Sequence, residues 1–293
     1  MSDLPENTPA LWRAHFPIPD STSHKYSRGT ALIRGGAVMT GATRLAARAA
    51  QRMGVGLVTL AVPTSALPIY AESLESVIVK PCDELAAWEI LLTDKKDPAI
   101  LIGPGLGLGV ERAEEVLAAL ATKRPCVIDA DALTNFADDP DALIKNLHAE
   151  CVLTPHEGEF VKLFGAIVPI DSPAPRGRGQ GVGVFPGRVD CALAAANRAG
   201  CIVLLKGAET IIAAPNGNTV VNRNAPPWLA TAGSGDVLAG MILGLVAQKM
   251  DAFNAACAAA WMHSRIGTLC GPGLIAEDIV AGIPPVLSEI IAL

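Results

Sequence analysis

The chain has 293 residues, a net charge of −6 and a hydrophobic fraction of 51%. This length fits one large α/β domain, and the acidic balance argues against a protein that binds nucleic acid through a basic face. Because only 4% of the residues are aromatic, the core must consist mainly of Ala, Val, Leu and Ile, as in α/β proteins whose parallel sheets are covered on both faces.

Neither a targeting segment nor a membrane span is expected from the sequence. The N-terminal residues contain no apolar signal core, and the longest apolar run, residues 237–247, is far shorter than the roughly 20 residues that a bilayer span requires. The seven cysteines form no CxxC pair, which argues against a zinc site and fits a reducing compartment. We therefore expect a soluble cytoplasmic protein with no membrane or nucleic-acid partner.

The predicted elements alternate between strands and helices after an irregular lead-in over residues 1–25. Strands are predicted at residues 30–33, 57–62, 99–102, 126–128, 151–153 and 202–205, and a hairpin at 211–214 and 219–221. Helices are predicted at residues 41–53 and 111–121, and from about residues 234 and 252 onward.

This alternation indicates an α/β fold with a mostly parallel central sheet and helices on both faces. One domain is expected over residues 26–293. The stretch 169–187, rich in Gly, Pro and Arg, breaks the pattern and is predicted to be a mobile insertion, not a second domain.

The strongest motif is TAGSGDVLAG, residues 231–240, which opens a predicted apolar helix. Gly233, Ser234 and Gly235 allow a tight turn whose backbone amides point outward at the helix start. These amides and the helix dipole together predict an anion hole. Asp236 follows in the first turn, and a carboxylate beside an anion site suits phosphoryl transfer. The alternative is that Asp236 only caps the helix.

Polar residues also follow the ends of other predicted strands, at the edge where open α/β sheets bind ligands. Asp129 and Asp131 could hold Mg²⁺ there, directly or through water, or could act as a helix cap and a surface acid. In TPHEGEF, His156 stands beside Glu157 and Glu159 and is a candidate for polar recognition, although a single His is more often structural.

Two further segments are candidate phosphate or ligand contacts. Lys206 ends an apolar strand, so its amino group must reach solvent or an anion such as a nucleotide phosphate, and Gly207 permits close approach. The alternative for Lys206 is a position at the rim of the sheet. The loop GPGLGLG, residues 103–109, could let the backbone approach a ligand or could be a simple turn. No Walker A motif is present, and a dinucleotide-binding GxGxxG is incomplete.

In combination these segments resemble the ADP/ATP-dependent NAD(P)H-hydrate dehydratases of the ribokinase-like superfamily. The matching pieces appear in family order over most of residues 25–290 and include MTGATRLAARAAQRMGVGLVTLAVP, LIGPGLG, VIDADAL, VLTPHEGEFVKLFG, VLLKGAETIIAAPNG and LATAGSGDVLAGMILGLVAQ. The resemblance implies a ribokinase-like fold and repair of NADH or NADPH that has been hydrated at the nicotinamide ring. It also implies a homo-oligomer. An epimerase domain, fused to some members, is not expected because too few residues precede residue 25.

The resemblance implies roles for individual residues. Asp236 would accept the proton of the C6 hydroxyl while that oxygen attacks the terminal phosphoryl group of ADP or ATP. The amides of residues 233–235 would stabilise the developing charge, Mg²⁺ would offset the charge of the donor, and loss of phosphate would restore the double bond. The residues implied to contact the hydrated cofactor are Ala42, Gly105, His156 and Asp236. Those implied to contact the nucleotide are Lys206, Gly207, Ala208, Glu209, Thr210 and Gly235.

Three segments depart from the family pattern: RGTALIRGGAVMTGA, in which Arg34 precedes the glycine pair, the stretch 169–187, and NRNAPPWLATAGSGD before the anion hole. Two other functions are compatible with the motifs. A ribokinase-like small-molecule kinase would use the same anion hole and Asp236 but would keep the phosphate on its product. A non-catalytic nucleotide-binding protein would bind without turnover.

Overall fold

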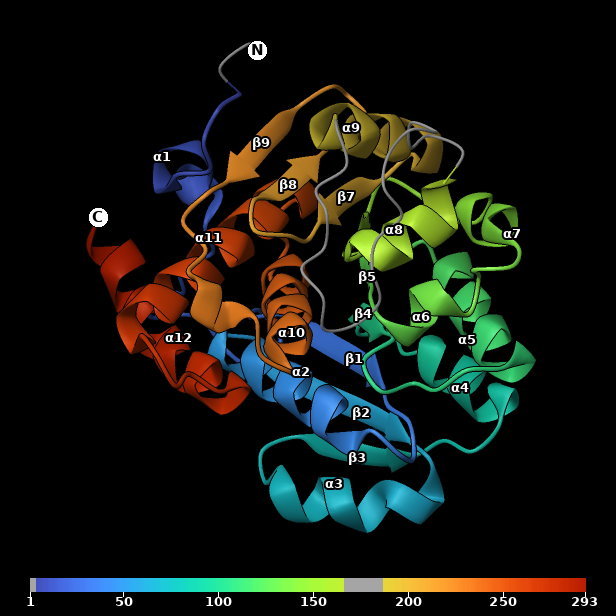
Figure 1. The fold of residues 1–293 in the computed structure, drawn as a ribbon. Helices are drawn as coiled ribbons and strands as arrows, with labels where there is room; N and C mark the ends of the chain where they lie inside the picture. Colours follow the sequence, from blue (N-terminus) through green and yellow to red (C-terminus); the bar gives the residue numbers. More distant parts are fainter. Residues whose placement is uncertain (1–3, 166–186) are drawn as a thin grey trace.

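One mixed sheet of nine strands runs through the computed structural model, which describes residues 4–165 and 187–293 (Figure 1). The strand order is β3-β2-β1-β4-β5-β6-β7-β8-β9. Neighbours from β3 to β7 are parallel, while β8 and β9 extend the sheet as antiparallel strands. The strands are β1 (Thr30–Arg34), β2 (Leu57–Val62), β3 (Ile78–Pro81), β4 (Ala99–Ile102), β5 (Cys126–Ile128), β6 (Cys151–Leu153), β7 (Ile202–Leu205), β8 (Thr210–Ala213) and β9 (Thr219–Asn222).

Helices cover both faces of this sheet, and each face has its own hydrophobic core. Successive strand residues point to opposite faces, so Leu101 of β4 belongs to one core while Ile100 and Ile102 belong to the other. The first face is covered by α2 (Thr40–Arg52), α3 (Leu67–Ser73), α10 (Ser234–Ala247), α11 (Ala252–Cys270) and α12 (Ala276–Ala292). The second is covered by α4 (Leu85–Leu92), α5 (Val110–Ala121), α6 (Asp131–Thr134), α7 (Pro140–Ile144), α8 (Glu157–Phe164) and α9 (Arg188–Ala199).

The predicted α/β architecture is confirmed, and each predicted strand and helix is present within one residue of its expected bounds. The sequence patterns predicted neither β3 nor the helices α3, α4, α6, α7, α8, α9 and α12. β3 is short, mostly exposed and ends at a proline, so it lacks the apolar run of a buried strand. The helix α12 contains the adjacent residues Pro284 and Pro285, which ordinarily end a helix.

The described part of the N-terminal lead-in packs against the domain. The amide of Asn7 donates to the Val221 carbonyl at 2.9 Å, and the Val221 amide donates to Pro5 at 3.1 Å, so this segment pairs with β9. The short helix α1 (Pro9–Trp12) buries Trp12 completely in the core that α10 and α11 also build. The predicted insertion at 169–187 lies outside the described residues, apart from Gly187. In the described ranges, no helix has the length and apolar character needed to cross a bilayer.

The central helix α10 is fixed by close packing against α2. A side chain at Gly240 would place its first carbon 2.2 Å from the Ala46 carbonyl oxygen, so only glycine lets the two helices approach this closely. α10 is buried along most of its length, and its first residues lie beside the carboxyl ends of the parallel strands. The fold therefore brings the start of α10 to the sheet edge where α/β proteins bind ligands.

Candidate active site

The start of α10 is an open helix terminus. Gly233 occupies the N-cap in the left-handed conformation, with φ of 87°, and supplies no side-chain cap. A side chain there would also collide with Leu45 and Ala276, so glycine is required on both counts. The first amides of a helix have no partner within the helix, and residues 233–235 are therefore placed to bind an anion.

Asp236 lies in the first turn of this helix and is partly buried. Its carboxylate accepts no hydrogen bond from any described residue, and Gly233, not Asp236, is the N-cap. The pKa of Asp236 is raised to about 7. Burial is the largest cause, the Asp129 and Asp131 carboxylates also raise it, and the Lys206 ammonium lowers it. A carboxylate that titrates near neutrality is suited to accept a proton during catalysis.

Asp129 and Lys206 form an ion pair beside this helix start. The two side chains meet at 2.8 Å, between Asp129 Oδ1 and Lys206 Nζ, and Asp129 is almost completely buried. Burial opposes the charge of Lys206, but Asp129, Glu159 and Asp236 outweigh it and raise the pKa of Lys206. A methyl group on Gly235 would lie 3.5 Å from Lys206 Nζ, which places the ammonium next to the helix N-terminus. The lysine therefore reaches an anion within the protein and lies where a second anion would bind.

The glycine-rich loop after β4 packs against the end of β5. A side chain at Gly103 would come within 1.8 Å of the Asp129 carbonyl oxygen. Farther along, the Gly107 amide donates to Asp131 Oδ2 at 2.9 Å. Asp129 and Asp131 thus both have protein partners, and the described residues contain no group of three or more His, Cys, Asp or Glu arranged to hold a metal ion. The pair remains a prediction as Mg²⁺ ligands.

Ala42 and Gly105 are brought together by the turn after β1. The Ala42 amide donates to the Met39 carbonyl at 3.2 Å, and a side chain at Gly105 would come within 2.3 Å of that same carbonyl oxygen. A side chain at Gly36 would lie 2.0 Å from the Gly105 carbonyl oxygen. The loops after β1 and β4 therefore form one closely packed unit at the point where the strand order reverses, between β1 and β4.

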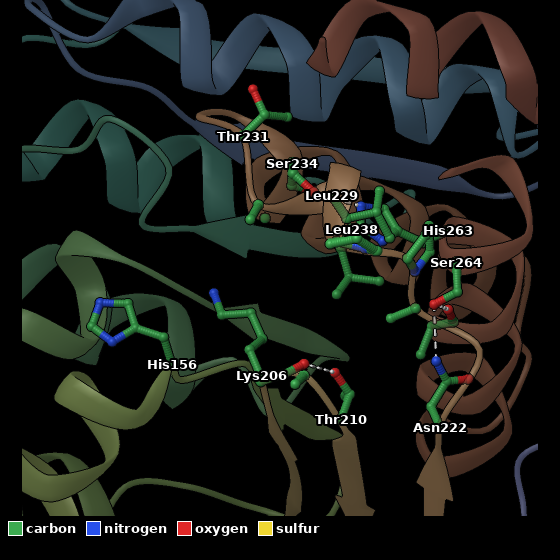
Figure 2. Close-up of a pocket in the computed structure, with 18 residues that line it drawn as sticks. His156, Lys206, Thr210, Asn222, Leu229, Thr231, Ser234, Leu238, His263 and Ser264 are labelled. Atoms are coloured by element: carbon green, nitrogen blue, oxygen red, sulfur yellow. Dashed lines mark hydrogen bonds between the residues drawn. The ribbon is translucent and has the colours of Figure 1, made fainter. Parts of the chain in front are cut away.

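A cavity of about 770 Å³ lies on the other side of the site (Figure 2). Five of the six residues expected to contact a nucleotide line it: Lys206, Gly207, Ala208, Thr210 and Gly235. Ser234 and His156 also line it. The sixth expected contact, Glu209, is exposed and pairs with Arg223 at 3.1 Å instead.

The far wall of the cavity is mainly apolar, and the sequence analysis missed it. It includes Ala225, Pro226, Pro227, Leu229, Leu238 and Ala260, which come from the segment before α10 and from α10 and α11. In Figure 2, Lys206 lies on one side of the cavity and His263 and Ser264 lie across from it. Four of these residues, from Ala225 to Leu229, fall in the segment that departs from the family pattern. Nothing in that segment indicated a cavity wall, because apolar residues carry no distinguishing pattern in a chain that is half hydrophobic.

His263, from the interior of α11, holds the anion-hole residue Ser234. Its Nε2 lies 3.1 Å from Ser234 Oγ and 3.0 Å from the Ser234 carbonyl oxygen. Burial lowers the pKa of His263 to about 4, so the ring is neutral at physiological pH. A neutral ring adds no charge to the site and fixes the turn at the start of α10.

His156 has a structural role at the N-cap of α8 in addition to its place in the cavity wall. Its Nδ1 accepts from the Glu159 amide at 3.2 Å, and Glu159 Oε2 accepts from the His156 amide at 2.9 Å, which completes a capping box. The pKa of Glu159 is raised to about 7, mainly by burial, which outweighs the opposing effect of the Lys206 ammonium. The TPHEGEF segment therefore combines a helix cap with a cavity-lining imidazole.

Comparison with known proteins identifies the family to which this chain is similar. The family model for NAD(P)H-hydrate dehydratase matches residues 30–288. A bifunctional NAD(P)H-hydrate repair enzyme Nnr from Salinibacter ruber is 38% identical over 97% of this chain. The chain spans about half of that relative, 53% of its length.

Solved structures share the fold over the whole chain. The crystal structure of ADP/ATP-dependent NAD(P)H-hydrate dehydratase from Bacillus subtilis, co-crystallised with ATP/Mg²⁺, has a TM-score of 0.80 and 27% identity. That comparison covers 99% of this chain and 100% of the other. A ribokinase-like superfamily protein from Enterococcus faecalis has a TM-score of 0.81 at 23% identity, covering 99% and 97%, and supports the fold alone. The chain has a ribokinase-like fold and belongs to the NAD(P)H-hydrate dehydratase family.

Proposed function

We propose that this chain dehydrates hydrated NADH or NADPH at the expense of ADP or ATP, and so returns the damaged cofactor to its active form. The observation that carries the proposal is Asp236, a carboxylate with a pKa of about 7 at an anion-binding helix start. The charges of Asp129, Lys206 and Asp131 act on it, and the two residues before it, Ser234 and Gly235, line the nucleotide-sized cavity. The functional domain proposed is residues 26–293, with residues 1–25 as its lead-in.

The residues present fit a magnesium-bound nucleotide. The apolar wall of the cavity suits a base, while Lys206 and the amides near Gly235 and Gly207 suit phosphates. Asp129 and Asp131 would hold Mg²⁺, directly or through water. The ion would offset the charge of the phosphates, as the structure of the B. subtilis relative with ATP/Mg²⁺ supports.

Phosphoryl transfer and elimination follow from this arrangement. Asp236 accepts the proton of the C6 hydroxyl, and the oxygen attacks the terminal phosphoryl group of the nucleotide, which leaves as AMP from ADP or as ADP from ATP. The amides of residues 233–235 stabilise the charge that develops on the phosphoryl oxygens. Loss of phosphate from C6, together with a proton from the adjacent carbon, then restores the ring double bond. Ala42, Gly105 and His156 are proposed to contact the hydrated cofactor.

The alternative is a ribokinase-like small-molecule kinase, because the same base and anion hole would serve a kinase whose phosphorylated product is stable. A third possibility is nucleotide binding without turnover. One assay separates the three: incubation with hydrated NADH and either ADP or ATP in parallel. Recovery of NADH with release of phosphate supports the dehydratase, a stable phosphorylated product supports the kinase, and binding without turnover supports neither enzyme. The same pair of reactions identifies the preferred donor.

We also propose that the protein acts as a cytoplasmic homo-oligomer whose partners are these small molecules. The support for an oligomer is the family resemblance, since most of the small residues of α2 are buried within the chain and Ala46 packs against α10. Light scattering on the purified chain measures the mass directly, and a mass equal to one chain would contradict the proposal.

A further inference from the structure

The loop that forms one side of the nucleotide cavity is attached to a buried arginine that no part of the proposed reaction uses. Arg188 is the first residue of α9 and is only 7% exposed. Its Nη1 donates to the Glu209 carbonyl at 2.7 Å, and its Nη2 donates to the Lys206 carbonyl at 3.3 Å. The guanidinium therefore spans the loop from its first residue to its fourth.

The third side of the guanidinium faces α8. Arg188 Nε and Glu157 Oε1 form an ion pair of 3.0 Å, and both side chains are buried. Glu157 immediately follows His156, which lines the cavity. One arginine thus joins two strand-end loops, the one after β6 and the one after β7, and both contribute residues to the cavity wall.

Glycine at position 207 makes this contact possible. A side chain there would place its first carbon 2.4 Å from Arg188 Nη2, so any larger residue would displace the guanidinium. The carbonyl and amide of a trans peptide point in opposite directions, and the Lys206 carbonyl points to Arg188. The Gly207 amide is therefore directed away from Arg188, and within the described part of the chain it donates no hydrogen bond. Gly207 itself lines the cavity.

We propose that Arg188 is a positioning residue for nucleotide binding, which holds the loop of residues 206–209 so that the Gly207 amide and the Lys206 ammonium face the phosphates of ADP or ATP. Arg188 does not line the cavity, so it acts through the loop and not by contact with the ligand. This inference rests on the proposed function for the identity of the ligand. It predicts an effect on nucleotide affinity that is separate from chemistry at Asp236.

The test is calorimetric binding of ADP and of ATP, each with Mg²⁺, to the purified full chain and its variants. Arg188→Met removes the hydrogen bonds and the charge, and we expect the nucleotide Kd to rise about tenfold or more. Arg188→Lys keeps the charge but loses the planar fork, and an intermediate Kd is expected. Arg198→Met is the matched control, because Arg198 lies on the same helix, is partly exposed and, among residues 4–165 and 187–293, forms an ion pair with Asp141 alone. Its Kd should equal that of the unmodified protein.

A double variant separates positioning from stability. Arg188→Met leaves Glu157 buried without its partner, which lowers the melting temperature, and adding Glu157→Gln removes that buried charge. We expect the double variant to recover much of the lost melting temperature while its nucleotide Kd stays high. In turnover with hydrated NADH, the KM for nucleotide should rise by more than the KM for the hydrate, because Arg188 touches the nucleotide loop directly and reaches His156 only through Glu157.

Three results would overturn the inference: an unchanged Kd in Arg188→Met, recovery of affinity together with stability in the double variant, or a rise in the KM for the hydrate alone. If the unmodified protein binds nucleotide tightly but leaves hydrated NADH intact, the proposed function fails while the Kd comparison still tests Arg188. If the unmodified protein binds neither nucleotide, both proposals fail.

Discussion

The two sides of the site are each supported by a buried arginine, but the two arginines are held differently. On the side of β1, Arg34 is fully buried and donates to both carboxylate oxygens of Glu115, at 3.1 and 2.8 Å. Arg112 adds a second ion pair to Glu115 at 2.6 Å. Arg34 also donates to the carbonyl of Gly35 at 2.8 Å, which fixes the glycine turn that packs on Gly105.

On the nucleotide side the network is less complete. Arg188 and Glu157 form an ion pair without a hydrogen bond between them, and Glu157 Oε2 is buried with no hydrogen-bond partner among the described residues. The turn after β1, which is proposed to contact the hydrated cofactor, is therefore held by a closed set of charged contacts. The nucleotide-side loop depends on two backbone carbonyls and one arginine. This difference indicates that the contacts of Arg34 contribute more to the stability of the fold, while the position of the loop after β7 depends on fewer contacts.

The largest effect is expected at Asp236, the proposed base. Asp236→Asn should lower kcat by about 10²–10⁴-fold, since general-base catalysis contributes that much, while nucleotide Kd stays near the unmodified value. Phosphate release and calorimetric binding measure the two quantities. Asp190→Asn is the matched control, because Asp190 is also the third residue of a helix whose N-cap is a left-handed glycine, and it is exposed. Near-normal turnover in Asp236→Asn would remove Asp236 as the base.

The second effect tests how much the contacts of Arg34, at the turn after β1, contribute to stability. Arg34→Met should lower the free energy of unfolding by about 3–5 kcal/mol, because it leaves the buried Glu115 without its main partner. Chemical denaturation measures this change. Arg112→Met removes the outer partner of the same carboxylate and should cost less, and Arg188→Met should also cost less than Arg34→Met. If Arg34→Met is no more destabilising than Arg188→Met, the contrast between the two sides is wrong.

The third effect concerns the nucleotide side alone. Lys206→Ala removes an ammonium beside the anion hole, and we expect the KM for nucleotide to rise about tenfold with a much smaller change in the KM for the hydrate. Lys145→Ala, an exposed lysine on the far surface of the second helical layer, is the control. Steady-state kinetics with either donor gives both constants. An unchanged KM for nucleotide would exclude Lys206 from the phosphate site.

Local sequence patterns predicted much of this site because its residues follow strand ends. Asp129 and Lys206 come directly after buried apolar strands, and His156 follows β6 by three residues. Parallel strands bring their carboxyl ends to one edge. The glycine turn at Gly233 and the acid at Asp236 are likewise contiguous in the chain. Short motifs therefore identified the side chains that meet at the sheet edge.

Contacts between distant segments could not be read in the same way. Arg188 contacts the loop of residues 206–209 because α9 packs beside that loop in the folded protein. Nothing in the sequence around Arg188 predicts that it donates hydrogen bonds to the Lys206 and Glu209 carbonyls. His263 is one polar residue in an apolar helix and meets Ser234 only because α11 packs beside α10. Glu209 shows the opposite case: it lies within the KGAET motif, yet its side chain turns to Arg223 and away from the cavity.

The smallest expected effect is a shift in the pH dependence of kcat. It tests whether Lys206 and Asp131 both act on the pKa of Asp236. With a pKa of about 7, Asp236 is protonated below that pH and cannot accept a proton, so kcat should fall as pH decreases through about 7 and reach a plateau above it. The acidic limb of the profile is the pH range over which kcat falls. Lys206 lowers the pKa of Asp236 and Asp131 raises it, so Lys206→Ala should move this limb to higher pH and Asp131→Asn should move it to lower pH. Saturating substrates isolate kcat, and each profile is normalised to its own plateau. A limb near pH 4, the ordinary range of an aspartate, would show that burial does not set the pKa of the base. Shifts of the same sign in the two variants would show that the limb reports a group other than Asp236.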